Sequence, residues 1–358
     1  MLKIVLFTVL SFVQAEDQLL YNPQKVDANG VVEFKYADYT TETGFQKTVK
    51  FSSYLPLKEN VNTSSESFNA ISSDNFASLK TTIPLTQAEY DCGETHQSRF
   101  QLLYGLYGYA AKFYENADIA PSITGLIKAG PNLFHYTGVP TEKQGTQGFI
   151  DVDISQQCNK EITQVGGFSQ LFYGLDSFGV VDSGCIPNND IPSGLTQCAD
   201  GSAIKSYLKG YTIGDFSNGN VDTVKNALLK FGPVWHNDDG LYVGWEKIDG
   251  VDNWITIQER EDDEEQEYYK SLYYQLNVPI GTKSTYAGRV VFFSDPYYGC
   301  TKITAETPEE TCPCPSDKTE LNDDPRHTKG GICAAGTTRI TLKVIATVLL
   351  LPVFTLFI

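Results

Sequence analysis

The first eighty residues contain short runs in which apolar and polar side chains alternate, notably at residues 31–36 and 47–51. Alternation with a period of two is typical of a β-strand that buries one face. A stretch rich in Ser and Asn follows at residues 61–78, and this composition favours a loop. The pattern predicts a β-rich N-terminal segment over residues 16–82, which is either a separate module or a propeptide-like cover.

Apolar residues at helical spacing follow. They predict helices over residues 98–114, 168–178 and 221–231, and Gly232-Pro233 ends the third. Runs typical of strands dominate the later part, at residues 241–245, 253–258, 268–276 and 289–293. Helices followed by strands predict an α+β fold with a helical lobe and a β-rich lobe.

The N-terminus has the pattern of a secretory signal peptide. Lys3 precedes an apolar run over residues 4–13, and the short residues around Ala15 complete a cleavage site. The apolar run is too short to cross a bilayer as a helix. We therefore expect cleavage after Ala15 and entry into the secretory pathway.

The C-terminal run over residues 344–358 is apolar and has no basic segment after it, in contrast with a stop-transfer helix. Cys333, Ala334 and a second Ala precede a polar spacer at residues 336–343, which is the order of a GPI attachment signal. We expect lipid attachment at Cys333 or Ala334, removal of residues 334–358 as the attachment propeptide, and display on the extracellular face of the plasma membrane. A single-pass membrane helix is the alternative.

The composition of the chain indicates which classes of ligand and modification to expect. The chain has 358 residues, 44 of them acidic and 27 Lys or Arg, so its formal net charge of −17 argues against nucleic acid as a ligand. Eight cysteines in a secreted chain favour disulfides. Asn62 begins a glycosylation sequon. The segment 295–333 predicts a disulfide-pinned stalk, and since its Cys and His spacing matches no strong zinc pattern, we expect neither metal nor cofactor.

Four segments carry motifs that occur together in one enzyme family. They are residues 84–96, with Pro-Leu-Thr-Gln and Asp-Cys-Gly-Glu-Thr-His; residues 154–187, with Gln-Gln-Cys and Gly-Gly-Phe; residues 198–201, Cys-Ala-Asp-Gly; and residues 232–255, with Gly-Pro-Val and Tyr-Val-Gly-Trp. Their order and spacing resemble the papain-like cysteine peptidases, and most closely the cathepsin-B-like branch. The resemblance implies a papain-like two-lobe domain over residues 83–294.

The catalytic positions depart from that family. The resemblance places the nucleophile at Thr95, the general base at Asp238 and the orienting amide at Gln258. A Thr hydroxyl lacks the easy ionisation of a thiol, and an Asp cannot form an imidazolium. The positions persist while the residues differ, which predicts a protein without peptidase activity.

An active enzyme is the alternative. Cys92 would be its nucleophile, His236 its base and Gln87 its oxyanion donor, provided that Cys92 is free. The resemblance instead implies a disulfide joining Cys158 to Cys198. It would also pair Cys92 with a position that is Val165 here, so we expect Cys185 to be the substitute partner of Cys92.

These observations lead to three hypotheses. The first is an inactive papain-like protein that binds a peptide, protein or glycan in the cleft between its lobes and is held at the membrane by a lipid anchor. The second is the active endopeptidase at the membrane. The third is a structural or adhesive coat protein, which would lack a helix beginning near Thr95.

Overall fold

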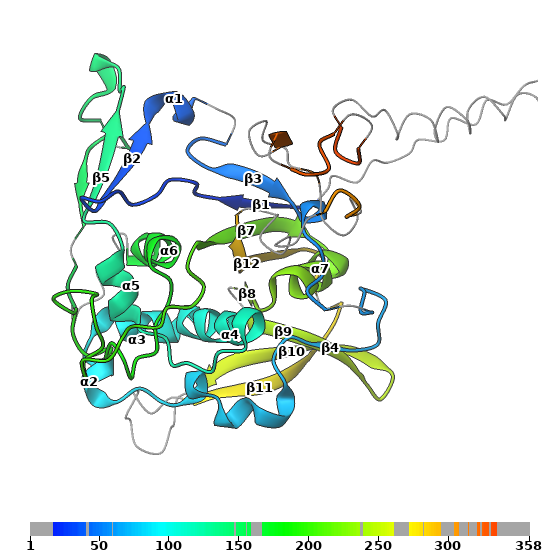
Figure 1. Cartoon of the computed structure of the whole chain (residues 1–358). Helices are drawn as coiled ribbons and strands as arrows, with labels where there is room; N and C mark the ends of the chain where they lie inside the picture. Colours follow the sequence, from blue (N-terminus) through cyan, green and yellow to red (C-terminus); the bar gives the residue numbers. More distant parts are fainter. Residues whose placement is uncertain are drawn as a thin grey trace, which may run out of the picture. The chain divides into compact units, whose positions relative to one another are not determined.

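The computed structural model describes residues 17–40, 43–58, 60–146, 148–154, 156–158, 167–236, 239–260, 272–281, 283–294, 304–307, 314, 321–322, 324–328 and 331–334. The chain divides into two compact units, residues 1–294 and 295–358. All of the named helices and strands lie in the first unit (Figure 1).

The helices and strands alternate irregularly along the first unit. The α-helices are α1 (Tyr36–Tyr39), α2 (Gln87–Tyr90), α3 (Gly93–Phe100), α4 (Leu103–Glu115), α5 (Ile123–Ala129), α6 (Gly167–Ser177) and α7 (Val221–Phe231). The strands are β1 (Gln18–Tyr21), β2 (Val31–Lys35), β3 (Lys47–Lys50), β4 (Phe68–Asn69), β5 (Leu133–Thr137), β6 (Val152–Asp153), β7 (Tyr211–Gly219), β8 (Val234–His236), β9 (Gly240–Ile248), β10 (Val251–Arg260), β11 (Leu272–Pro279) and β12 (Tyr286–Phe293). Single turns of 3-10 helix, η1 (Phe51–Ser53), η3 (Lys80–Thr82) and η4 (Thr141–Lys143), and the longer η2 (Ser73–Ser78) join them.

A nine-stranded sheet organises the first unit. Its strand order within the described residues is β11-β10-β9-β8-β12-β7-β1-β3, and β4 pairs with β9. Every pairing in this sheet is antiparallel. A smaller sheet has the order β2-β5-β6, in which β2 and β5 run parallel.

Helices cover both faces of the large sheet, because its strands bury apolar side chains on both sides. Leu106 of α4, with Val243 and Ile257 of the sheet, belongs to a core that also includes α5 and α6. Leu228 of α7 and Tyr242 belong to a second core on the opposite face. Figure 1 shows α4 and α7 beside different parts of the sheet. The predicted α+β class is therefore confirmed.

The N-terminal segment is integrated into this architecture. Strand β1 pairs with β7 and β3 pairs with β1, so the two strands extend the large sheet at one edge. Strand β4 also joins the large sheet, while β2 joins the smaller one. Leu19 on β1 is completely buried in the second core. Residues 17–82 thus share a core with the rest of the first unit and are not a separate module.

The helix predicted over residues 98–114 is two helices, which corrects the sequence-based expectation. Helix α3 ends at Phe100 and α4 begins at Leu103. Leu102 between them has φ of 59°, in the left-handed region that a residue with a β-carbon rarely adopts. The carbonyl of Gln101 accepts a hydrogen bond from Trp235 Nε1 at 2.7 Å, so tertiary contact satisfies the backbone at the break.

Candidate functional site

Helix α3 begins close to the position implied for a nucleophile-bearing helix. The short helix α2 precedes it, and a capping box stabilises the N-terminus of α2. In this box Glu89 N donates to Thr86 Oγ1 at 3.3 Å and Thr86 N donates to Glu89 Oε2 at 2.8 Å. Cys92 is the N-cap residue of α3, and Gly93 is its first residue. Thr95 therefore lies in the first turn of α3.

The side chain of Thr95 has a structural partner. Its hydroxyl donates to the backbone carbonyl of Asn188 at 3.1 Å, and the residue is 0% exposed. A hydroxyl that is enclosed and already donating cannot approach a substrate bond without breaking the local packing. The residue at the family's nucleophile position thus fastens a loop to helix α3.

Asn188 connects this loop to a second helix. Its Oδ1 accepts from Ile123 N at 2.6 Å and from Thr124 N at 3.4 Å, while its Nδ2 donates to Pro121 O at 2.8 Å. Ser122 caps the same helix end by accepting from the backbone N–H of residue 125 at 3.0 Å. Because these groups are buried, the network fixes the loop against α5 as well as α3.

The disulfides use the expected cysteines with exchanged partners. Cys92 is bonded to Cys158, with 4.7 Å between their Cα atoms, and Cys185 is bonded to Cys198, with 4.4 Å between theirs. The predicted pairs of Cys158 with Cys198 and Cys92 with Cys185 are therefore wrong. The reason is local: Ala199 N donates to Cys185 O at 2.8 Å, which brings Cys198 beside Cys185 and leaves Cys158 for Cys92.

Cys92, the alternative nucleophile, cannot act as a nucleophile in this arrangement. Cys92 is 1% exposed and its sulfur is in a disulfide, so it has no thiol to ionise. The proposed oxyanion donor Gln87 is engaged elsewhere, because its Nε2 donates to Asp91 Oδ1 at 3.1 Å on the exposed side of α2. The free Cys92 that the active-enzyme alternative requires is absent from the structure.

His236 lies on the opposite face of the sheet from α3. Adjacent residues of a strand point to opposite faces, and its neighbour Trp235 bonds Gln101 between α3 and α4. The His236 ring instead lies 5.5 Å from the ring of Tyr242 and 6.4 Å from that of Tyr286, both in the second core. The structure therefore does not bring His236 and Cys92 together.

Gln258 lies beside the turn that follows β8. Its Nε2 donates to Asp239 O at 3.4 Å, and its Oε1 accepts from the Tyr274 hydroxyl at 3.2 Å. Asp238, the implied base position, lies outside the described residues. Gln258 thus contacts the backbone of Asp239, and neither of its two hydrogen bonds involves Thr95.

A charged group beside Gln258 had no signal in the sequence. Asp239 Oδ2 lies 2.7 Å from Lys283 Nζ and 3.9 Å from His236 Nδ1, and it accepts a hydrogen bond from the Tyr242 hydroxyl. Burial raises the pKa of Asp239, but the Lys283 and Tyr242 contacts outweigh it, and the net pKa lies below the usual value for aspartate. These residues form an ion-paired group that joins the β8–β9 turn to the segment between β11 and β12.

Arg99 is a second residue that sequence reasoning missed. It is 1% exposed on α3, with its Nε 3.5 Å from Glu259 Oε1 and its guanidinium 4.1 Å from the ring centre of Tyr273. It also donates to Ile83 O at 3.0 Å. One buried cation thus holds α3 against strands β10 and β11.

The glycosylation position remains accessible in the structure. Asn62 is exposed, and its Oδ1 accepts from Ser64 N at 2.9 Å in a turn. The same loop is fixed to the body, because Lys225 Nζ donates to Thr63 O at 3.1 Å and Trp245 Nε1 donates to Ser65 O at 2.8 Å. Modification of Asn62 stays a prediction.

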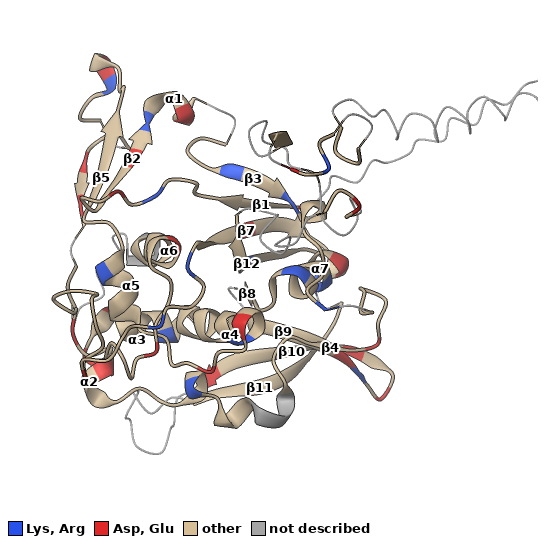
Figure 2. Ribbon diagram, viewed as in Figure 1, with Lys and Arg blue, Asp and Glu red and all other residues tan. Residues whose placement is uncertain are grey.

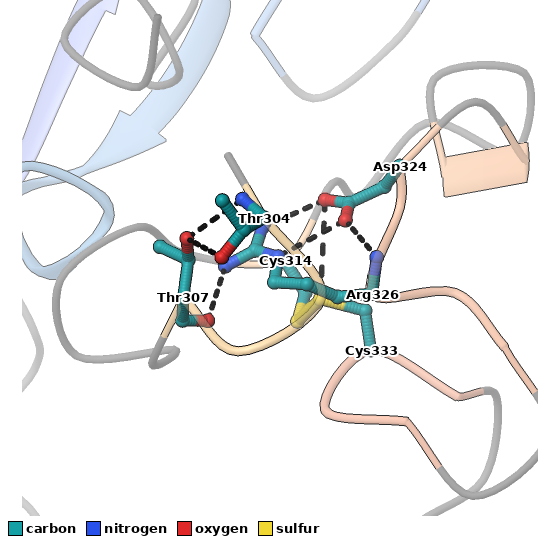
Figure 3. Close-up of polar contacts among 6 residues, drawn as sticks. All are labelled: Thr304, Thr307, Cys314, Asp324, Arg326 and Cys333. Carbon is teal, nitrogen blue, oxygen red and sulfur yellow. Dashed lines mark hydrogen bonds and ion pairs between the residues drawn. A yellow bond between two sulfur atoms is a disulfide. The ribbon is translucent and has the colours of Figure 1, made fainter. Parts of the chain in front are cut away.

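The second unit contains a small buried polar group (Figure 3). Arg326 is 0% exposed and donates to Asp324 through Nε at 3.0 Å and through a terminal nitrogen at 2.7 Å. Another nitrogen of Arg326 donates to Thr307 O at 3.4 Å. Cys333 is bonded to Cys314 and donates its backbone N–H to Arg326 O at 3.2 Å. The expected lipid-attachment position Cys333 is thus buried and cross-linked.

Two hollows lined by described residues lie away from the candidate catalytic positions. One of about 20 Å³ lies between residues 21–25, α6 and β7, and one of about 420 Å³ lies at β4, β9, β10 and β11. The described residues contain no cluster of His, Cys, Asp and Glu that could hold a metal ion. No helix in the described part of the chain is long and apolar enough to span a bilayer.

Comparisons with known proteins give limited matches. No family model matches the chain, and no curated protein matches it. Among solved structures, the mite allergens Blo t 1 and Der p 1 are the subject of one match, with 15% identity over 66% of this chain and 74% of the other, at a TM-score of 0.35.

Two further solved structures are similar at the same level. ProCathepsin B S9 from Trypanosoma congolense matches with 14% identity over 67% of this chain and 84% of its own, at a TM-score of 0.33. Procathepsin L 3 from the larval midgut of Tenebrio molitor matches with 14% identity over 67% and 74%, at a TM-score of 0.34. At these values the α+β class rests on the helices and strands of the chain itself.

Proposed function

We propose that this chain is a secreted protein of papain-like fold that lacks peptidase activity, is held at the cell surface by a lipid anchor, and acts as a binding module. The resemblance of the four motif segments supports the papain-like fold. The signals at the two ends of the sequence support secretion and the lipid anchor. The peptide, protein or glycan ligand would lie in the cleft between the helical and β-rich lobes.

The state of Thr95 is the observation that supports inactivity most directly. A nucleophile must reach its substrate and transfer its proton to a base. The Thr95 hydroxyl is fully buried and donates to a backbone carbonyl at 3.1 Å, and no titratable side chain is its hydrogen-bond partner. The only cysteine in the first turn region, Cys92, is held in a disulfide.

A peptidase assay with matched variants tests this proposal. The full chain is incubated with a fluorogenic peptide library between about pH 4 and 8, a range that covers the ordinary pKa values of carboxylates and histidine. We expect no hydrolysis above the blank. The double variant Cys92→Ala/Cys158→Ala is compared with Cys185→Ala/Cys198→Ala, which removes a disulfide without touching α3. Hydrolysis that disappears only in the first variant contradicts the proposal.

The disulfide map provides a second, independent test. Mass spectrometry of the non-reduced protein should yield a peptide that joins Cys92 to Cys158 and another that joins Cys185 to Cys198. A free Cys92 thiol in the purified protein would revive the active-enzyme alternative.

The anchor is tested on intact cells. A phosphatidylinositol-specific phospholipase should release the protein from the surface of cells that express the full chain. Protein that stays on the membrane after a control GPI protein has been released would favour the single-pass alternative. The coat-protein alternative expected no helix near Thr95, whereas α3 begins at Gly93, so no observation favours it.

A further inference from the structure

The larger hollow lies in a row of residues that crosses four strands. Asn69 of β4 pairs with Gly244 of β9, Gly244 pairs with Ile255 of β10, and Ile255 pairs with Asn277 of β11. Residues directly opposite one another in antiparallel strands share a face of the sheet, so this row faces one side. Figure 1 shows β4 beside β9, and β10 and β11 follow on the other side of β9.

Gly244 explains how β4 can lie so close to β9. It has no side chain, and a β-carbon at this position would lie 2.1 Å from Phe68 O, closer than any side chain could be accommodated. The glycine thus lets β4 approach β9, because the backbone of β4 occupies the place that a side chain would need. The hollow beside this row has a volume of about 420 Å³, within the range of about 300–1,000 Å³ usual for small-molecule sites.

The lining combines polar and apolar residues, and one cation lies against it, since Lys58 Nζ donates to Asn69 O at 3.0 Å. Its polar side chains are three amides, one hydroxyl and one carboxylate, from Asn69, Gln275, Asn277, Ser67 and Glu246. The carboxylate is positioned by Asn277, whose Nδ2 donates to Glu246 Oε1 at 3.1 Å. Figure 2 places acidic and basic positions together at the nearby β9–β10 turn. There Lys247 lies 3.8 Å from Asp252, so its charge is directed away from the hollow.

Gln275 supplies a hydrogen-bond donor that the protein does not use. Its Nε2 is shielded from solvent and has no hydrogen-bond partner, although the residue lines the hollow. A shielded donor without an acceptor is costly to maintain and gains a bond when a ligand brings one. Ile255, which is buried, shares the face of the sheet with Gln275 and adds an apolar side chain to the lining.

We propose that this hollow binds a neutral saccharide. Amide groups both donate and accept, and a carboxylate accepts, so together they match hydroxyl groups, each of which can do either. The apolar side chain of Ile255 suits the carbon-bound face of a sugar ring. A phosphate or sulfate group would meet the carboxylate of Glu246, while the ammonium of Lys58 already donates to Asn69 O. The site is separate from Thr95, so it stands whether or not the chain has peptidase activity.

Titration of the full chain with neutral disaccharides tests this inference. Chitobiose, mannobiose, lactose and maltose are added at up to about 10 mM, and binding is detected by saturation-transfer NMR and measured by calorimetry. We expect at least one of them to bind. Sulfated lactose serves as the anionic probe and should bind more weakly than lactose, or not at all.

Three variants locate the binding. Gln275→Glu keeps the shape but replaces the donor, and Asn277→Ala alters an exposed residue that the fold does not need, so each should weaken binding about tenfold. Gln24→Glu is the matched control, because Gln24 also has a shielded side-chain atom without a partner but lines the smaller hollow. It should bind as the unmodified protein does.

Three results would overturn the inference. They are the absence of binding by all of the neutral disaccharides, unchanged binding in both Gln275→Glu and Asn277→Ala, and stronger binding of sulfated lactose than of lactose. Thermal unfolding of each variant confirms that it is folded.

Discussion

Replacement of Thr95 by valine separates a structural hydroxyl from a catalytic one. Valine has the same shape, so the change removes the 3.1 Å hydrogen bond to Asn188 O and little else. The carbonyl then remains buried with one partner fewer, which costs about 1–3 kcal/mol. For a unit of this size about 2 kcal/mol corresponds to a decrease in Tm of roughly 4–8 °C.

Urea unfolding of the disulfide-intact protein measures this change. The three tryptophans report the transition by fluorescence, and a lower midpoint at unchanged slope indicates a change in stability alone. Thr81→Val is the matched positive control, because Thr81 is also buried and its hydroxyl donates to Ile119 O at 2.7 Å. Thr141→Val, at an exposed position, should stay within about 0.5 kcal/mol of the unmodified protein.

The comparison among these variants decides the role of Thr95. A structural hydroxyl requires Thr95→Val and Thr81→Val to lose stability to a similar extent. If Thr95→Val unfolds at the same urea concentration as Thr141→Val, the hydrogen bond contributes nothing, and the argument that Thr95 fastens the loop fails. Loss of a measurable activity without loss of stability would instead make Thr95 a functional residue.

Three further changes probe how the first unit is held together. Arg99→Met removes the buried cation that lies 3.5 Å from Glu259, whose side chain is 13% exposed, and should cost about 3 kcal/mol in urea unfolding, whereas Arg99→Lys, which keeps the charge, should cost less. The contact with Lys283 lowers the pKa of Asp239, so the stability that Asp239 contributes is present above the unfolded pKa of about 3.9 and is lost as the pH falls below it. Asp239→Asn should therefore be less stable than the unmodified protein at pH 7 and should lose less stability on acidification. Equal acid sensitivity in the two proteins would contradict this. A Gly→Ala change within a helix normally stabilises it by up to about 1 kcal/mol. In Gly174→Ala the new β-carbon would lie 2.1 Å from a carbonyl oxygen of α5, so calorimetry should show a lower Tm. A higher Tm would refute the close approach of α5 and α6.

Local pattern predicted the elements whose signals are local. Helix α7 matches its expected bounds, because it combines a strong apolar face with a stop at Gly232-Pro233. The strands β9, β10 and β12 contain the runs predicted for them. Helix α5 was missed because its seven residues are too few to show a period, and β7 was missed because Gly214 and Asp215 interrupt its apolar pattern.

Long-range features could not be read in the same way. Four cysteines allow three pairings, and the choice depended on a backbone hydrogen bond between Ala199 and Cys185 that no spacing reveals. The break between α3 and α4 contains neither glycine nor proline, and it depends on Trp235, which follows more than a hundred residues later. The resemblance implied a helix beginning near Thr95, but the burial of Thr95 against Asn188 required the folded loop.

The N-terminal segment shows how far the chain departs from a domain with a detachable cover. Leu19 is completely buried in the second core, and Phe51, which is 4% exposed, packs against Phe231 of α7 with 5.2 Å between ring centres. Removal of residues 17–51 would therefore uncover apolar surface and expose the edge of β7. Moreover, Lys47 and Lys50 lie at the two ends of β3, the outermost strand, where charge discourages pairing with another chain. Since a cover that leaves must not take part of the core with it, the burial of Leu19 argues that this segment is a permanent part of the folded protein.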